Sequence, residues 1–86
     1  MIRVLIVDTH NLVRVALETR LRSAVGLEII GSTSEYEEAM QQARRLHPDI
    51  VLLETKAPKG IETLEALCQA IPQCAVIVLT LSLIHI

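Results

Sequence analysis

The feature that most constrains the fold of this chain is a regular alternation of aliphatic runs with stretches of helical period. Four aliphatic runs predict strands, at residues 2–8, 27–32, 49–54 and 74–80. The first, IRVLIVD, does not alternate between apolar and polar residues, which is typical of a strand buried on both faces. Strands and helices that alternate over short connections imply a parallel sheet with right-handed crossovers and helices on its faces.

Three stretches between these runs have the period of amphipathic helices. The first, residues 11–26, ends at Gly26, a residue typical of a helix C-cap. The second begins at Ser34, and Glu37 three residues later predicts a capping box. The third, residues 60–71, is expected to turn one apolar face inward, formed by Ile61, Leu64, Leu67, Cys68 and Ile71.

Length and composition limit the classes of protein that this chain can belong to. Its 86 residues allow one domain, and a hydrophobic content of 51% with one aromatic residue predicts an aliphatic core. The net charge of −2 provides no general attraction to nucleic acid or to an anionic membrane. Asp8 comes too early for a signal peptide, and no apolar run is long enough to cross a bilayer. Cys68 and Cys74 are expected as buried thiols of a reducing compartment, so we expect the cytoplasm.

Polar residues end the predicted strands: Asp8 and Thr9, Ser32, Glu54, and Thr80. In parallel sheets, ligands bind outside the carboxyl ends of the strands. Hard oxygen ligands on this rim suit a divalent metal and phosphoryl chemistry. The alternative is that acids end buried strands only because charge must leave the core. A small phosphatase, nucleotide-binding enzyme, dehydrogenase or hydrolase is disfavoured, because no phosphate-binding loop or nucleophile elbow is present in the sequence, and we expect no enzyme.

Taken together, these segments resemble the receiver domain of bacterial two-component response regulators. The resemblance covers residues 2–80 through the segments IRVLIVD, LEIIGS, EEAMQQARRLHPDIVLLE and VIVLT, in that order. It is nearest to the subgroup with a LuxR-type helix-turn-helix output domain. The resemblance implies a three-layer α/β/α, flavodoxin-like parallel sheet, incomplete here with four of the usual five strands.

The resemblance also implies roles for individual residues on the rim. Asp8 keeps the first position of an acidic pair that binds Mg²⁺, and Thr9 replaces the second acid. Glu54 stands where the family has its phospho-acceptor aspartate, and Lys56 would offer its backbone carbonyl to the metal. Thr80 keeps the hydroxyl that responds to the phosphoryl group. His10, in the loop after the first strand, is expected to be a solvent-exposed side chain.

Three differences from the family fall on this rim: Thr9, Glu54, and a loop to Gly60 that is about two residues short. An added methylene displaces a carboxylate by about 1 Å, and a displacement of this size can lower the rate of phosphoryl transfer about a hundredfold. A neutral Thr9 weakens the Mg²⁺ site. We therefore expect a phosphorelay receiver with a degenerate phosphorylation site, in which Glu54 either imitates the phosphorylated state or is a relic.

The resemblance implies two partners: a histidine kinase, whose role the altered rim weakens, and a DNA-binding domain in the full-length parent that regulates transcription. The alternative function is a phosphorylation-independent protein-interaction module, or pseudo-receiver. We expect no direct contact with nucleic acid or membrane. Residues 81–86, LSLIHI, resemble the translation of a transposon-end adaptor, so the receiver is expected to span residues 1–80 and the tail to be artefactual. The alternative is a natural terminus that continues the fourth strand.

Overall fold

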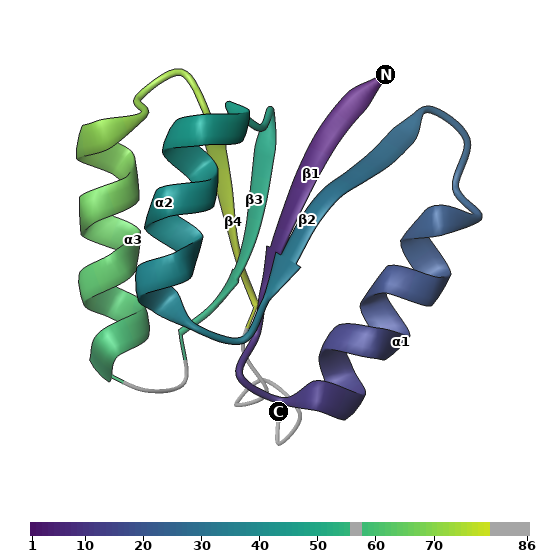
Figure 1. The fold of residues 1–86 in the computed structure, drawn as a ribbon, viewed down its shortest axis with the longest axis horizontal. Helices are drawn as coiled ribbons and strands as arrows, with labels where there is room; N and C mark the ends of the chain where they lie inside the picture. The colour runs from purple at the N-terminus through teal and green to yellow at the C-terminus, as the bar shows by residue number, and fades with distance from the viewer. Residues whose placement is uncertain (56–57, 80–86) are drawn as a thin grey trace, which may run out of the picture.

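Four parallel strands and three helices alternate along the chain. The computed structural model describes residues 1–55 and 58–79. The elements are β1 (Ile2–Val7), α1 (Asn11–Arg22), β2 (Leu27–Thr33), α2 (Tyr36–Leu46), β3 (Ile50–Glu54), α3 (Pro58–Ala70) and β4 (Ala75–Leu79). The strand order is β2-β1-β3-β4. Helices α2 and α3 cover one face of the sheet and α1 covers the other (Figure 1), which confirms the predicted three-layer α/β/α fold.

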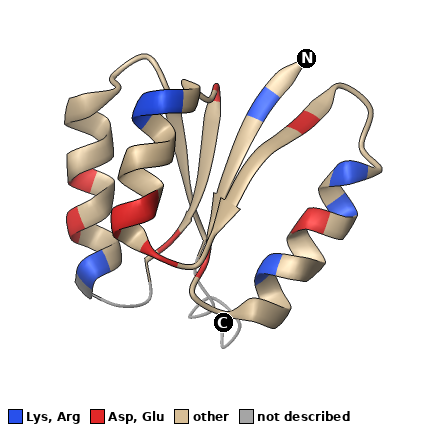
Figure 2. Ribbon diagram, viewed as in Figure 1, with Lys and Arg blue, Asp and Glu red and all other residues tan. Residues whose placement is uncertain are grey.

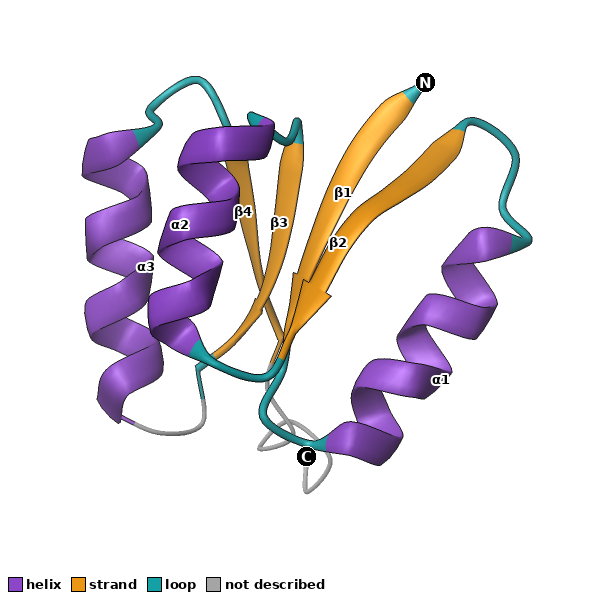
Figure 3. Ribbon diagram, viewed as in Figure 1, coloured by secondary structure: helices purple, strands orange, loops and turns teal. Residues whose placement is uncertain are grey.

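The core lies on the side of the sheet that faces α2 and α3. Val4, Leu5, Ile6 and Val7 of the central strand are all 2% exposed or less, as the non-alternating run predicted. Leu5 and Val7 join the cluster beneath α2 and α3, together with Ala39, Ala43, Val51, Leu53, Leu67 and Ile71. Helix α1, which covers the opposite face of the sheet (Figure 3), has no fully buried residue, so its layer contributes less to the core.

The predicted inward face of α3 is confirmed at three positions and wrong at two. Leu67 and Ile71 are buried and Leu64 packs against the core, but Ile61 is 54% exposed and Cys68 is also exposed. Gly60 and Thr63 take the inward positions instead. The reason is a close approach at the start of the helix, where a Cβ on Gly60 would lie 2.7 Å from the Thr55 Cα and 2.8 Å from the Glu54 carbonyl oxygen. The expectation that Cys68 is buried is therefore wrong, and Cys74 is only partly buried.

Two predicted helix caps are also wrong. Helix α2 begins after Glu35 and has no side-chain cap from Ser34. The neighbouring Thr33 hydroxyl accepts a hydrogen bond from the Glu35 N–H at 3.1 Å and donates one to Glu38. Helix α1 ends at Arg22, and Gly26 adopts a φ of +90° in the turn that leads into β2.

Strand β4 lies at one end of the sheet order and is paired with β3. Two of its large apolar side chains are exposed, Ile77 at 46% and Val78 at 42%. Thr80 and the tail at residues 81–86 lie outside the described residues, so their predicted roles stay predictions. None of the helices in the described ranges is long and apolar enough to cross a membrane.

Candidate functional site

The carboxyl ends of β1 and β3 bring two acids together. Val7 of β1 is paired with Leu53 of β3, so the residues that follow, Asp8 and Glu54, leave the sheet side by side. Both are buried, at 2% and 4% exposure. Figure 2 shows further acidic residues near this rim, at the start of α2. The sequence therefore predicted the neighbourhood of Asp8 and Glu54 correctly from strand ends alone.

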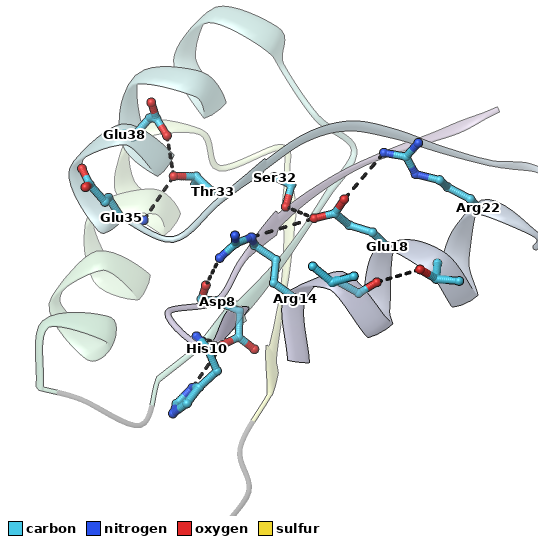
Figure 4. Close-up of polar contacts among 11 residues, drawn as sticks. Asp8, His10, Arg14, Glu18, Arg22, Ser32, Thr33, Glu35 and Glu38 are labelled. Atoms are coloured by element: carbon cyan, nitrogen blue, oxygen red, sulfur yellow. Dashed lines mark hydrogen bonds and ion pairs between the residues drawn. The ribbon is translucent and has the colours of Figure 1, made fainter. Parts of the chain in front are cut away.

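Asp8 is held by the loop and helix that follow it. Its Oδ1 accepts a hydrogen bond from the His10 backbone N–H at 2.8 Å, and the His10 Nδ1 lies 3.3 Å from the same oxygen. The Arg14 guanidinium of α1 donates to the Asp8 backbone carbonyl at 3.2 Å (Figure 4). The His10 side chain is 39% exposed. The prediction of a solvent-exposed histidine missed this contact, because a turn of the loop folds the ring back over Asp8.

Glu54 receives hydrogen bonds from two neutral hydroxyl groups. The Thr9 hydroxyl donates to Oε1 at 3.0 Å. The Tyr36 hydroxyl lies 3.1 Å from the same Oε1 and 3.2 Å from the Glu54 carbonyl oxygen. A phenol has one proton, so it shares that proton between two acceptors of one residue. Glu54 is thus bound both from the loop after β1 and from α2.

Tyr36 is the site residue that sequence reasoning missed. Its ring is 7% exposed and belongs to the hydrophobic core, while its hydroxyl reaches the rim. Burial, followed by the hydrogen bond and the negative charge of Glu54, raises the pKa of Tyr36 to about 12. The phenol therefore stays protonated at neutral pH and serves as a donor. One available clue was that a lone aromatic residue opens the second helix of an otherwise aliphatic chain.

Of the remaining predicted rim residues, the structure describes only Ser32, which does not join this group. The Ser32 hydroxyl donates to Glu18 Oε2 at 2.6 Å, which turns it toward α1 (Figure 4). Lys56 and Thr80 lie outside the described residues. The group at the rim therefore consists, among the described residues, of Asp8, Thr9, His10, Tyr36 and Glu54.

Three of these side chains could hold a metal ion. Asp8, His10 and Glu54 each offer one ligand atom, and these atoms lie within 4.8 Å of one another. Mg²⁺ demands six oxygen ligands in near-ideal octahedral geometry. The described side chains offer two carboxylates and an imidazole, and the neutral Thr9 hydroxyl is engaged with Glu54. Mg²⁺ usually keeps several waters and is held by one or two carboxylates, so Asp8 and Glu54 could hold it, and the His10 imidazole adds a donor that suits a transition-metal ion.

The fold and the acidic rim define a class: parallel α/β signalling domains that carry their site at the carboxyl ends of β1 and β3. Residues 4–83 match the family model described as the response regulator receiver domain. The chain belongs to this family, whose members receive signals in phosphorelays. This confirms the predicted resemblance and the predicted function class.

Relatives and solved structures agree with this assignment. The chain is 39% identical to the response regulator GacA of Pseudomonas viridiflava over 93% of its own length and 38% of GacA. It is 35% identical to the transcriptional regulatory protein LiaR of Bacillus subtilis, over 93% of this chain and 39% of LiaR. The chain thus spans about two fifths of these relatives.

Among solved structures, the response regulator domain of Thermotoga maritima CheB superposes with a TM-score of 0.83 at 28% identity. That match covers 93% of this chain and 60% of the CheB domain chain. The signal receiver domain of a modulated diguanylate cyclase from Desulfovibrio desulfuricans superposes with a TM-score of 0.84 at 31% identity. That match covers 96% of this chain and 67% of the cyclase receiver chain. The flavodoxin-like receiver fold is therefore established for the described chain.

Proposed function

We propose that this receiver domain signals without accepting a phosphoryl group, as a pseudo-receiver. The observation that carries the proposal is the pair of hydrogen bonds from Thr9 and Tyr36 to Glu54 Oε1. These bonds engage one of the two carboxylate oxygens and hold the side chain in one orientation. Glu54 is also one methylene longer than the aspartate of the family.

The charge of the rim supports the same proposal. Phosphoryl transfer depends on positioning and on a metal ion that neutralises the developing charge. Thr9 supplies a neutral hydroxyl where the family has a second acid, so Mg²⁺ binding is weak and the metal cannot align a phosphodonor well. We infer no catalytic role of this domain on other molecules.

We favour the relic over the mimic as the role of Glu54. Two hydrogen bonds to its carboxylate come from Thr9, in the loop after β1, and from Tyr36 of α2, and both meet Oε1. We propose that the carboxylate stabilises the rim in one conformation and that it does not imitate the phosphorylated state.

The relatives suggest the wider context. LiaR is named a transcriptional regulatory protein, and a solved structure of Salmonella RcsB, similar in fold at 19% identity, is bound to a promoter. We propose that the parent of this domain regulates transcription in the cytoplasm through its own DNA-binding domain. Input from a histidine kinase would then act by contact and not by phosphoryl transfer.

The test is intact-mass analysis after incubation with acetyl phosphate and Mg²⁺. We expect no labile adduct on the natural chain. The double variant Thr9→Asp, Glu54→Asp restores the acids of the family and is the positive control, which we expect to gain a phosphoryl group. A labile adduct on the natural chain that Glu54→Gln abolishes would refute the proposal.

A further inference from the structure

We propose that Asp8, His10 and Glu54 form a binding site for a divalent transition-metal ion, with Zn²⁺ as the reference case, in preference to Mg²⁺. The site lies on the rim described above. The inference does not depend on the proposed function, because binding of the ion requires no phosphoryl group.

The first argument is the placement of the three side chains. Their ligand atoms lie within 4.8 Å of one another, so a small approach of the side chains would let one ion contact all three. The pairing of β1 with β3 places Asp8 beside Glu54. The hydrogen bond from the His10 backbone N–H to Asp8 Oδ1 holds His10 next to Asp8. Three protein ligands and a remaining open position are typical of Zn²⁺ sites that keep a water ligand.

The second argument is the chemistry of the donors. Imidazole suits Zn²⁺, Cu²⁺, Ni²⁺ and Fe²⁺, whereas carboxylate, carbonyl and water suit Mg²⁺. One imidazole and two carboxylates therefore select a borderline ion that accepts low coordination numbers. A neutral hydroxyl at Thr9 removes the anionic oxygen that would favour Mg²⁺.

The third argument is the state of Asp8. Buried carboxylates are normally paired with a cation or bound to a metal. Asp8 is 2% exposed, and its one ion-pair partner in the described part of the chain is His10, which is charged only when protonated. The hydrogen bonds between the Asp8 carboxylate and His10 fall on Oδ1, and the Arg14 guanidinium bonds to the Asp8 backbone carbonyl, so it does not pair with the carboxylate. A bound cation would supply the Asp8 carboxylate with a positive partner when His10 is neutral.

The chain offers a matched pair of histidine variants for the test. His10 precedes α1 as its N-cap residue with no side-chain cap, and asparagine is a preferred N-cap residue. His47 is an exposed residue with φ +51° at the end of α2, a conformation that asparagine tolerates. His10→Asn and His47→Asn therefore make the same substitution without disturbing the backbone. Cys68→Ser controls for binding at the exposed thiol.

The experiment titrates the metal-free 86-residue chain with Zn²⁺, Co²⁺ and Mg²⁺ salts by calorimetry. Co²⁺ also reports its ligands through visible absorption. Tyr36, the sole aromatic residue, reports through its fluorescence, because its hydroxyl lies 3.1 Å from Glu54 Oε1. We expect one ion per chain, with Zn²⁺ and Co²⁺ bound at least about tenfold more tightly than Mg²⁺. His10→Asn should lose at least about tenfold in Zn²⁺ affinity, a loss seen even for outer-shell partners. His47→Asn and Cys68→Ser should bind as the natural chain does.

Four outcomes would overturn the inference: unchanged Zn²⁺ affinity in His10→Asn, equal affinity for Mg²⁺ and Zn²⁺, loss of binding in Cys68→Ser, or no saturable binding. These outcomes are separate from the test of the proposed function. A phosphoryl adduct formed with Mg²⁺ would refute the pseudo-receiver proposal. It would not decide the preference for Zn²⁺, which only the metal titrations test.

Discussion

Replacing Tyr36 by phenylalanine tests whether the hydroxyl on Glu54 stabilises the fold. The ring is 7% exposed and packs in the core, and phenylalanine keeps that packing. What the substitution removes is the donor that lies 3.1 Å from Glu54 Oε1 and 3.2 Å from the Glu54 carbonyl. The effect therefore measures one shared hydrogen bond to a buried carboxylate.

The expected magnitude follows from the partner. A hydrogen bond to a charged group contributes about 1.5–3 kcal/mol, and a neutral one about 1 kcal/mol. Since the single phenolic proton is shared between a carboxylate and a carbonyl, we expect Tyr36→Phe to lower the free energy of unfolding by about 1.5–2.5 kcal/mol. In a domain of this length that corresponds to a decrease in Tm of roughly 6–20 °C.

The assay is urea unfolding followed by far-ultraviolet circular dichroism, because the variant lacks the only aromatic reporter. A double-mutant cycle with Glu54→Met measures the interaction energy between the Tyr36 hydroxyl and the Glu54 carboxylate, because methionine removes the carboxylate and keeps a similar shape. We expect a coupling energy of about 1 kcal/mol, since the hydroxyl retains the carbonyl as an acceptor in Glu54→Met. A change below about 0.5 kcal/mol for Tyr36→Phe, or a coupling energy near zero, would refute the reasoning.

Three further predictions concern stability and association. Because the pKa of Tyr36 is raised to about 12, its contribution to the free energy of unfolding is complete below pH 10 and is lost as the pH rises toward 12. Urea unfolding at stepped pH should show the free energy of unfolding fall by an amount on the order of 2–3 kcal/mol over this range, and Tyr36→Phe should lack this fall. Gly60→Ala should destabilise by about 1–3 kcal/mol in urea melts although alanine favours helices, because its Cβ would meet backbone atoms at 2.7 and 2.8 Å; a neutral effect would mean that α3 can move. The exposed Ile77 and Val78 on β4 should make the 86-residue chain associate, so size exclusion should give a concentration-dependent size that Val78→Lys reduces; a monomer with a cooperative melt at every concentration would contradict this.

The sequence predicted the order of elements and the pair of acids on the rim because both depend on local pattern. A strand of non-alternating aliphatic residues is buried wherever its neighbours lie, and a polar residue that ends it must reach an edge of the sheet. Asp8 and Glu54 could therefore be placed together without coordinates. Tyr36 could not, because its hydroxyl meets Glu54 across 18 residues of chain, which helix periodicity does not encode.

The errors in the helices have the same origin. The inward face of α3 was assigned from hydropathy, which favours Ile61 and Cys68. The structure selects Gly60 and Thr63 because the helix begins against the Glu54 carbonyl, where there is no room for a side chain. The predicted cap at Ser34 failed by one residue, since Thr33, the buried last residue of β2, already directs its hydroxyl at α2. Hydropathy and capping patterns along one helix do not predict its contacts with the strand or loop that precedes it.

The changes on the rim are consistent with one another in physical terms. A buried carboxylate is stable when its oxygens receive hydrogen bonds, and an adjacent second carboxylate would add like-charge repulsion unless a cation lay between them. Thr9 in place of that second acid leaves Asp8 as the neighbouring acid, so it lowers the repulsion on Glu54, and its hydroxyl supplies a donor; Tyr36 supplies another. Glu54, longer by one methylene, meets these donors at 3.0 and 3.1 Å. These two neutral hydroxyl groups stabilise Glu54 without adding charge to the rim. It follows that Thr9→Asp alone should lower the free energy of unfolding of the metal-free chain. The new carboxylate would repel Glu54, and the hydroxyl that donates to Glu54 Oε1 would be lost.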